Sequence, residues 1–320
     1  MSVLVRVLVT KLLPLGATYA VVLVLLQTGI VDSFIEATLA TICINIILAA
    51  GLNLVTGFTG QFSLGHAGFM AIGAYACALV TIAYPTLPGF IAGMLLGAVM
   101  AAAVGFLVGL PTLRLRGDYL AIATLGMAEI IRILLLNFEF TNGAAGLTGM
   151  PRMVDWTWMF WLTAGTVVII ANLLKSAHGR AFIAIREDEI AAESIGVNST
   201  RMKTLAFTVG AFFAGIAGAM YASYFYFIKP DLFGFLKSID ILMIVVLGGL
   251  GSLSGSILAA ILLALISTLL QPFPEIRMII YAAALVVIMI FRPEGLLGDR
   301  ELSLNFLKKY RKPRTQEGAA

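Results

Sequence analysis

Apolar runs of about twenty residues recur along this chain, and they limit its fold more than any other feature. A helix of about that length crosses the ~30 Å hydrocarbon core of a bilayer. Apolar residues make up 60% of the chain and charged residues only 12%, whereas a soluble domain carries roughly a quarter charged residues. The runs therefore predict an all-α, polytopic membrane protein.

The apolar runs predict ten transmembrane spans. The first, residues 12–30, follows Arg6 and Lys11 in the manner of a signal peptide. The small residues 17–20, which resemble a cleavage site, lie inside this run rather than after it, so we expect a retained span. The other spans are expected at residues 34–56, up to 84, 89–110, 119–137, 158–174, 204–227, between 237 and 248, 256–271 and 277–291.

Positive charge is distributed unevenly between the two sides of these spans. Of the 21 lysines and arginines, sixteen fall on the side of both termini and the loops 57–65, 111–118, 175–203 and 248–255, and four fall on the other side. Cytoplasmic loops are rich in Lys and Arg, so we expect the first side to be cytoplasmic. This organisation predicts one transmembrane domain, 1–298, and a basic cytoplasmic tail, 299–320.

Residues 178–203 form an island of charge in the apolar sequence. Within it, residues 188–195 predict a helix about 12 Å long, at ~1.5 Å per residue. Its acidic first turn complements the helix dipole, Gly196 supplies a left-handed residue that ends it, and Asn198 and Ser199 can cap the next helix. Such a segment is either a solvated helical loop or a rigid docking element within the cytoplasmic loop 175–203.

Two glycine-rich segments, residues 56–65 and 247–255, align if one gap is allowed. Matching glycine breaks in two halves of a transporter indicate its substrate path. Independent packing of small residues between helices explains the two segments equally well. The second segment lacks the strand, helix and acidic residue of a dinucleotide-binding loop, so we reject that function.

Glu129 and Arg132 lie within the span 119–137, three residues apart, so their side chains share a helix face. Counted from the cytoplasmic edge, Glu129 lies about 15 Å deep and Arg132 about 20 Å deep. An ionisable group at the centre of a span costs about 2.5–3.5 kcal/mol and usually faces a partner or a cavity. Two interpretations remain: a mutual ion pair that only ties helices together, or a role in lining or gating a path.

Other polar residues of the spans also have structural explanations. His66 could shuttle protons, but a hydrogen-bonded structural role is favoured because it begins a helix after a glycine loop. Asn53 and Gln61 are residues of the kind that more often join helices than bind substrate. Cys43 and Cys77 fall in apolar segments, which argues against a disulfide framework or a metal site.

The sequence contains no Gly-x-x-x-x-Gly-Lys-Ser/Thr loop, so we expect no ATP site in this chain. No constellation of nucleophile, oxyanion donors or metal ligands emerges, which makes a membrane-embedded enzyme the weakest class. A secondary transporter or channel remains an alternative, although it would be expected to carry ionisable residues on several spans. The net charge of +4 is weak evidence for nucleic acid, because positive residues have a use in topology.

Several motifs resemble the branched-chain amino acid permease family of ABC importers, in particular its LivM-type subunits. They occur in the family's order at residues 51–54, 59–67, 116–122, 129–132, 178–203 and 292–298. The segment 189–196, Glu-Ile-Ala-Ala-Glu-Ser-Ile-Gly, resembles the ATPase-coupling segment of such permeases. One departure is the loop 141–149, which lacks the Thr-Gly-Gly-x-x-Gly string common in the family. That loop bears on the substrate-delivery protein and hence on substrate identity.

The resemblance implies a permease subunit of an importer in the bacterial inner membrane, which moves branched-chain or other hydrophobic amino acids; urea or a short amide is the alternative substrate. The implied partners are a homologous, LivH-like second permease, two cytoplasmic ABC ATPases, a periplasmic substrate-binding protein and membrane lipid. ATP and Mg would be bound by the ATPases, leaving this chain with no cofactor and no enzymatic activity.

Two sets of site residues follow. The ATPase-coupling set is Arg180, Arg186, Glu187, Asp188, Glu189, Ala192, Glu193 and Gly196. The substrate-path set is Asn53, Gly60, Gln61, His66, Glu129, Arg132, Gly248 and Gly251.

Overall fold

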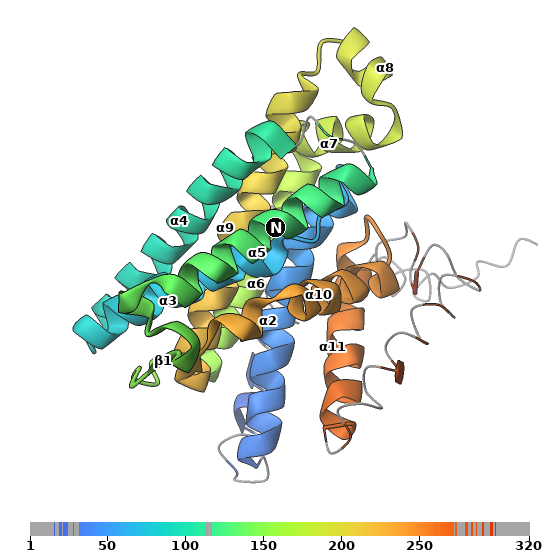
Figure 1. Ribbon diagram of the computed structural model, residues 1–320. Helices are drawn as coiled ribbons and strands as arrows, with labels where there is room; N and C mark the ends of the chain where they lie inside the picture. Colours follow the sequence, from blue (N-terminus) through green and yellow to red (C-terminus); the bar gives the residue numbers. More distant parts are fainter. Residues whose placement is uncertain are drawn as a thin grey trace, which may run out of the picture.

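The computed structural model describes residues 32–112, 115 and 117–271, together with isolated residues between 16 and 28 and between 273 and 298. In these residues the chain forms a bundle of α-helices (Figure 1). Six of the described helices are long and apolar enough to cross a membrane. They are α2 (Ser33–Thr56), α3 (His66–Ala83), α4 (Leu87–Thr112), α5 (Asp118–Asn137), α6 (Trp156–Lys175) and α9 (Ser199–Phe225).

These six helices correspond to six of the ten predicted spans, and the all-α polytopic class is confirmed. Two further predicted spans correspond to shorter helices, α10 (Phe235–Gly248) and α11 (Leu253–Leu269). α10 has 14 residues, so it is about 21 Å long and by itself shorter than the hydrocarbon core. The predicted spans 12–30 and 277–291 lie outside the continuously described residues, as does the tail 299–320.

Short elements lie at the two ends of the bundle. At one end, α7 (Ala177–Glu187) and α8 (Glu189–Ser194) project beyond the long helices (Figure 1). At the opposite end, β1 (Leu147–Thr148) pairs antiparallel with β2 (Phe227–Ile228). Three short 3₁₀ turns accompany the strands: η1 (Glu139–Thr141), η2 (Gly143–Ala145) and η3 (Pro230–Phe233).

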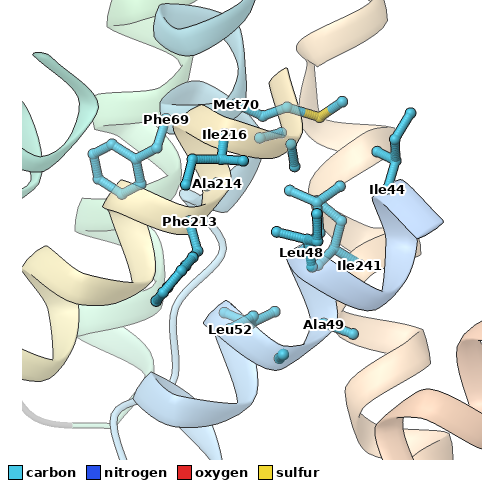
Figure 2. Close-up of a cluster of buried hydrophobic side chains, with 14 of the residues drawn as sticks. Ile44, Leu48, Ala49, Leu52, Phe69, Met70, Phe213, Ala214, Ile216 and Ile241 are labelled. Carbon is cyan, nitrogen blue, oxygen red and sulfur yellow. The ribbon is translucent and has the colours of Figure 1, made fainter. Parts of the chain in front are cut away.

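The core forms where α2, α3, α9 and α10 meet (Figure 2). α2 is apolar on all sides and is buried almost continuously from Cys43 to Thr56, as expected of a helix enclosed by others. Leu48 of α2 and Ile241 of α10 point toward one another in this cluster. α4 and α5 instead expose many large apolar side chains, which suits surfaces that face lipid.

Small residues set the spacing of the central helices. A side chain at Gly73 of α3 would collide with the backbone of Gly215 in α9. A Cβ at Gly97 of α4 would lie 2.8 Å from the carbonyl oxygen of Gly73. Close approach through small residues is the usual basis of helix packing within membranes. The three helices therefore approach one another closely at these glycines.

Candidate functional site

Asn53 joins the last turn of α2 to the start of α11. Its side chain is fully buried, and its Nδ2 donates hydrogen bonds to the Ser252 carbonyl oxygen at 2.9 Å and to the Ser256 Oγ at 2.8 Å. Its Oδ1 accepts a hydrogen bond from the Gly251 N–H at 2.9 Å. Because both amide hydrogens are used within the protein, Asn53 acts in this structure as a link between helices.

The two glycine-rich segments meet at this junction. A Cβ at Gly57 would overlap the Asn53 side chain and the backbone N of Gly251. Gly251 has a φ of 89°, a conformation that side chains with a Cβ adopt only at a cost. Gly248 packs directly against the backbone of Gly255, so the second segment is also compact. The two segments are therefore in contact, and the contact between them is one of close packing.

The predicted helix 188–195 exists as α8, with each boundary shifted inward by one residue. The Asp188 carboxylate caps it by accepting hydrogen bonds from the N–H groups of Ile190 at 2.9 Å and Ala191 at 3.0 Å. Gly196 follows the helix with a φ of 89°, and Asn198 Oδ1 accepts the Arg201 N–H at 2.9 Å to begin α9. Gly196 and Asn198 therefore lie where the sequence predicted them, whereas Ser199 is the first residue of α9 and its buried hydroxyl has no hydrogen-bond partner among the described residues.

Two features of this segment were not predicted from the sequence. α7 precedes α8 as a separate helix, and it buries Phe182 and Ile185 against the bundle. α8 and the residue that follows it leave two large apolar side chains exposed, Ile190 at 73% and Ile195 at 77%. Isoleucines within a charged helix were the available signal for this exposed apolar surface, which is typical of a docking site.

The ATPase-coupling set divides by exposure. Ala192 is the buried residue of α8. The exposed members of the set are Arg180, Glu187, Asp188, Glu193 and Gly196. Glu189 is half-buried and accepts a hydrogen bond from Lys203 Nζ at 2.6 Å, which ties α8 to α9. The exposed members, together with the two isoleucines, present a mixed apolar and charged face at one end of the bundle.

Arg186 connects α7 with the first glycine-rich segment. Its Nη1 donates to the Gly57 carbonyl oxygen at 3.2 Å, and its Nη2 donates to Glu187 Oε1 at 2.7 Å. Gly60 lies against the same side chain, because a Cβ placed there would be 3.4 Å from Arg186 Cγ. The coupling residue Arg186 and the path residue Gly60 are therefore direct neighbours.

A small cavity of about 130 Å³ lies at this contact. Its lining includes Thr59, Gly60 and Gln61 of the first glycine-rich segment and the charged residues Arg186, Glu189 and Lys203. Gln61 is buried, and within the described ranges neither its Nε2 nor its Oε1 has a hydrogen-bond partner. The structure thus places Gln61 beside the coupling set rather than beside Glu129 or Arg132.

His66 begins α3 and is also buried. A Cβ at Gly51 would lie 3.2 Å from His66 Nε2 and 3.1 Å from the Gly210 carbonyl oxygen, so the imidazole fills space where α2 and α9 approach. No hydrogen-bond partner of Nε2 is found in the described part of the chain. His66 begins a helix, as the sequence predicted, and its hydrogen-bonded structural role stays a prediction.

Glu129 and Arg132 form an ion pair at the opposite end of the bundle, with Arg132 Nε 2.7 Å from Glu129 Oε2. A third member, Asp231 of η3, was not foreseen; its Oδ1 lies 3.1 Å from Arg132 Nη1. The side chains of Arg132 and Asp231 are 27% and 55% exposed, so the charges are only partly desolvated. We call these three residues the charged triad. The positive and negative groups side by side can bind carboxylate and ammonium groups.

The structure thus separates the predicted site residues into three groups. Asn53, Gly248 and Gly251 lie where the two glycine-rich segments meet, which we call the glycine junction; Gly60 and Gln61 contact the coupling segment; Glu129 and Arg132 join the charged triad. His66 belongs to none of these groups and lies between α2 and α9. In the described ranges, no three His, Cys, Asp or Glu residues are gathered closely enough to hold a metal ion.

Comparison with known proteins finds one matching family model and several related permeases. Residues 34–289 match the family described as branched-chain amino acid transport system / permease component. The chain is 42% identical over 289 residues to the high-affinity branched-chain amino acid transport system permease protein LivM of Escherichia coli K12, covering 79% of this chain and 68% of that protein. No solved structure matches.

Weaker similarity extends to a second kind of permease. The chain is 24% identical over 284 residues to the permease protein LivH of Escherichia coli K12, covering 80% of this chain and 92% of LivH. It is also 24% identical over 287 residues to the permease protein BraD of Pseudomonas aeruginosa, with 80% of this chain and 92% of BraD covered. All three relatives carry names of high-affinity branched-chain amino acid transport permeases.

Proposed function

Because this chain belongs to the family of branched-chain amino acid transport permeases, we propose that it is a membrane-spanning subunit of an ABC importer that carries branched-chain or other hydrophobic amino acids. The observation that carries the proposal furthest is the bond between Arg186 and Gly57. A permease driven by separate ATPases needs a mechanical connection from an exposed docking surface into the helical bundle. This bond supplies one.

The proposed docking surface for the ATPases is α8. Ile190 of the helix and Ile195, which directly follows it, are exposed and can insert into an apolar groove, while Glu187 and Glu193 offer negative charge at the rim. ATP and Mg are bound by the ATPase subunits, and this chain contributes no cofactor site and no catalysis. The orientation that fits is the one predicted from charge, with ten spans, α8 in the cytoplasm and both termini on the same side.

The remaining partners follow from the family. Similarity to both LivM and LivH supports a complex in which two homologous permeases stand side by side. A periplasmic binding protein delivers substrate to the end that carries the charged triad. The domain organisation proposed from sequence, 1–298 for the permease and 299–320 for a cytoplasmic tail, is retained with this arrangement.

Mechanically, closure of the ATPases displaces α8, and the capped, rigid helix moves together with α7. Arg186 transmits this displacement to the backbone at Gly57, whose neighbour Asn53 holds the start of α11. The helices that meet at the glycine junction then reorient as rigid bodies, which is the usual basis of alternating access. Arg132 and the carboxylates beside it line the outer part of the path and complement the carboxylate and ammonium of an amino acid.

The test is purification of the complex through a tag on this chain, followed by reconstitution in liposomes. We expect two ATPase subunits and a second permease to co-purify. We also expect uptake of labelled leucine, isoleucine and valine to require ATP and the periplasmic binding protein. Uptake of urea or acetamide instead of leucine would favour the alternative substrate class. Uptake without any ATPase would contradict the proposal and indicate a secondary transporter or channel.

A further inference from the structure

A cavity of about 530 Å³ lies between α4 and α9, at the end of the bundle that carries α7 and α8. It adjoins none of the three groups of site residues described above. The residues that line it are Phe106 and Leu110 of α4, Asn198 before α9, and Thr200, Arg201, Thr204, Leu205 and Thr208 of α9. The lining therefore combines one cation, several polar groups and an apolar wall.

α4 and α9 approach each other closely beside the cavity. A Cβ at Gly105 of α4 would lie only 2.6 Å from Ala211 Cβ in α9. Phe106 follows Gly105 directly and Leu110 lies about one turn beyond Phe106; both line the cavity together with Thr204 and Thr208 of α9. Large apolar side chains therefore bound the cavity on the α4 side, and hydroxyl groups contribute to its lining on the α9 side.

Arg201 provides the positive charge of the cavity. Its side chain is exposed, and its guanidinium has no ion pair or hydrogen bond with any residue that the structure describes. The hydroxyls of Thr204 and Thr208 donate to helix carbonyls one turn earlier, at 2.7 and 2.8 Å. Arg201 is thus the principal donor available to a ligand, and a guanidinium recognises phosphate groups with paired hydrogen bonds.

The apolar wall continues out of the cavity along α4. Phe106 and Leu110 are both partly exposed, and the neighbouring Leu107 is 66% exposed. Further along the same helix, Val99 and Leu95 also remain exposed, so an apolar strip runs from the cavity over much of the length of α4. An inorganic anion would gain nothing from this strip, whereas a ligand with acyl chains would bury it.

We propose that this cavity binds the headgroup of an anionic phospholipid, with Arg201 contacting the phosphate and an acyl chain lying on Phe106, Leu107 and Leu110. Basic pockets between membrane helices hold anionic headgroups in this way. The cavity lies where α4 ends and α9 begins, which is the level at which headgroups meet a membrane protein. The site requires only that the chain resides in a membrane, and it is independent of the transported substrate.

The test is native mass spectrometry of the full chain, purified in mild detergent with its co-purifying subunits and stripped of lipid. Phosphatidylglycerol, phosphatidylethanolamine with the same acyl chains, and inorganic phosphate are added separately. We expect phosphatidylglycerol to bind preferentially, and Arg201→Gln to lower its binding about fivefold, as expected for one charge near a headgroup. Arg201→Lys should lose less, and Lys175→Gln, which removes an exposed cation outside the cavity and outside both sets of site residues, should bind as the unaltered chain does.

A second variant tests the cavity itself. Leu205→Trp fills the apolar side while Arg201 stays in place, so it should also reduce phosphatidylglycerol binding. Equal binding by the unaltered chain and Arg201→Gln would overturn the proposal. So would displacement of the lipid by millimolar inorganic phosphate, which would mean a simple anion site. Loss of the ATPases from Arg201→Gln with lipid binding unchanged would show that a protein partner occupies the cavity instead.

Discussion

Arg186 on α7 donates a hydrogen bond to the carbonyl oxygen of Gly57, at the end of α2, over a distance of 3.2 Å. The two residues are 129 positions apart in the chain. Gly57 in turn touches Asn53, which holds the start of α11, so an exposed pair of short helices is connected to the centre of the bundle in two steps. The predictions below begin with this connection.

Replacing Arg186 should uncouple transport. Arg186→Gln removes the charge-assisted bonds to Gly57 and Glu187, each worth about 1.5–3 kcal/mol, and Arg186→Lys keeps the charge but loses the paired geometry. We expect uptake to fall at least about tenfold in the glutamine variant and less in the lysine variant, while ATPase activity of the complex persists. Uptake and ATP hydrolysis are measured on the same proteoliposomes. Unchanged uptake in Arg186→Gln would contradict the proposed connection.

Gly196 should be replaceable only at the expense of coupling. Its φ of 89° resists any residue with a Cβ, at a cost of about 1–2 kcal/mol, although no atom lies within 4 Å of a Cβ built there. Gly196→Val should therefore insert normally but lose ATPase co-purification and uptake. Gly165→Ala is the matched control, because a Cβ there also meets no atom and Gly165 lies within α6.

The charge on α8 can be tested separately. Glu193 is exposed on this helix, so its replacement should not affect folding. Glu193→Lys should weaken ATPase docking by reversing one charge at the rim of the proposed surface, and the effect should diminish at high salt. The amount of ATPase that co-purifies at low and high ionic strength is the measurement. If the unaltered chain and Glu193→Lys recover the same amount of ATPase at both ionic strengths, Glu193 is not part of the docking surface.

The charged triad should respond unequally to loss of its members. Glu129→Gln leaves Arg132 paired with Asp231, so stability should change by less than about 1 kcal/mol, as for partly exposed ion pairs. Arg132→Gln leaves two carboxylates facing one another and should be the less stable variant. The double variant, which combines Glu129→Gln with Arg132→Gln, should recover stability. It should still transport poorly, because the path loses two of its three charged groups. Thermal unfolding and uptake are compared in all three, and full uptake by a stable double variant would reduce the pair to a structural role.

Asn53 should be among the polar residues most sensitive to substitution. Asn53→Ala leaves the Gly251 N–H without its buried partner and also removes the bonds to Ser252 and Ser256. Each unsatisfied buried group costs about 1–3 kcal/mol, so we expect a marked fall in the midpoint of thermal unfolding. Ser256→Ala removes one of these bonds and should have a smaller effect. Equal midpoints for the two variants would show that the junction does not depend on Asn53.

Part of this protein is determined by its sequence through local physics. A run of apolar residues needs no distant partner to favour a membrane helix, so α2, α4, α5, α6 and α9 follow from their own residues. The end of α8 at Gly196 and the cap of α9 at Asn198 are local as well. The family also belongs to this part, because its motifs are short strings of sequence.

Other features were decided only by the tertiary structure. Hydropathy did not distinguish α10, which has 14 residues, from a helix that crosses the whole membrane. The sequence also did not predict α7, because its few buried apolar residues lie among charged ones. The bonds from Asn53 to Gly251, from Arg186 to Gly57 and from Arg132 to Asp231 join residues 198, 129 and 99 positions apart. A hydrogen bond depends on positions correct to a few tenths of an ångström. Those positions result from how all the helices pack together, which no single segment specifies.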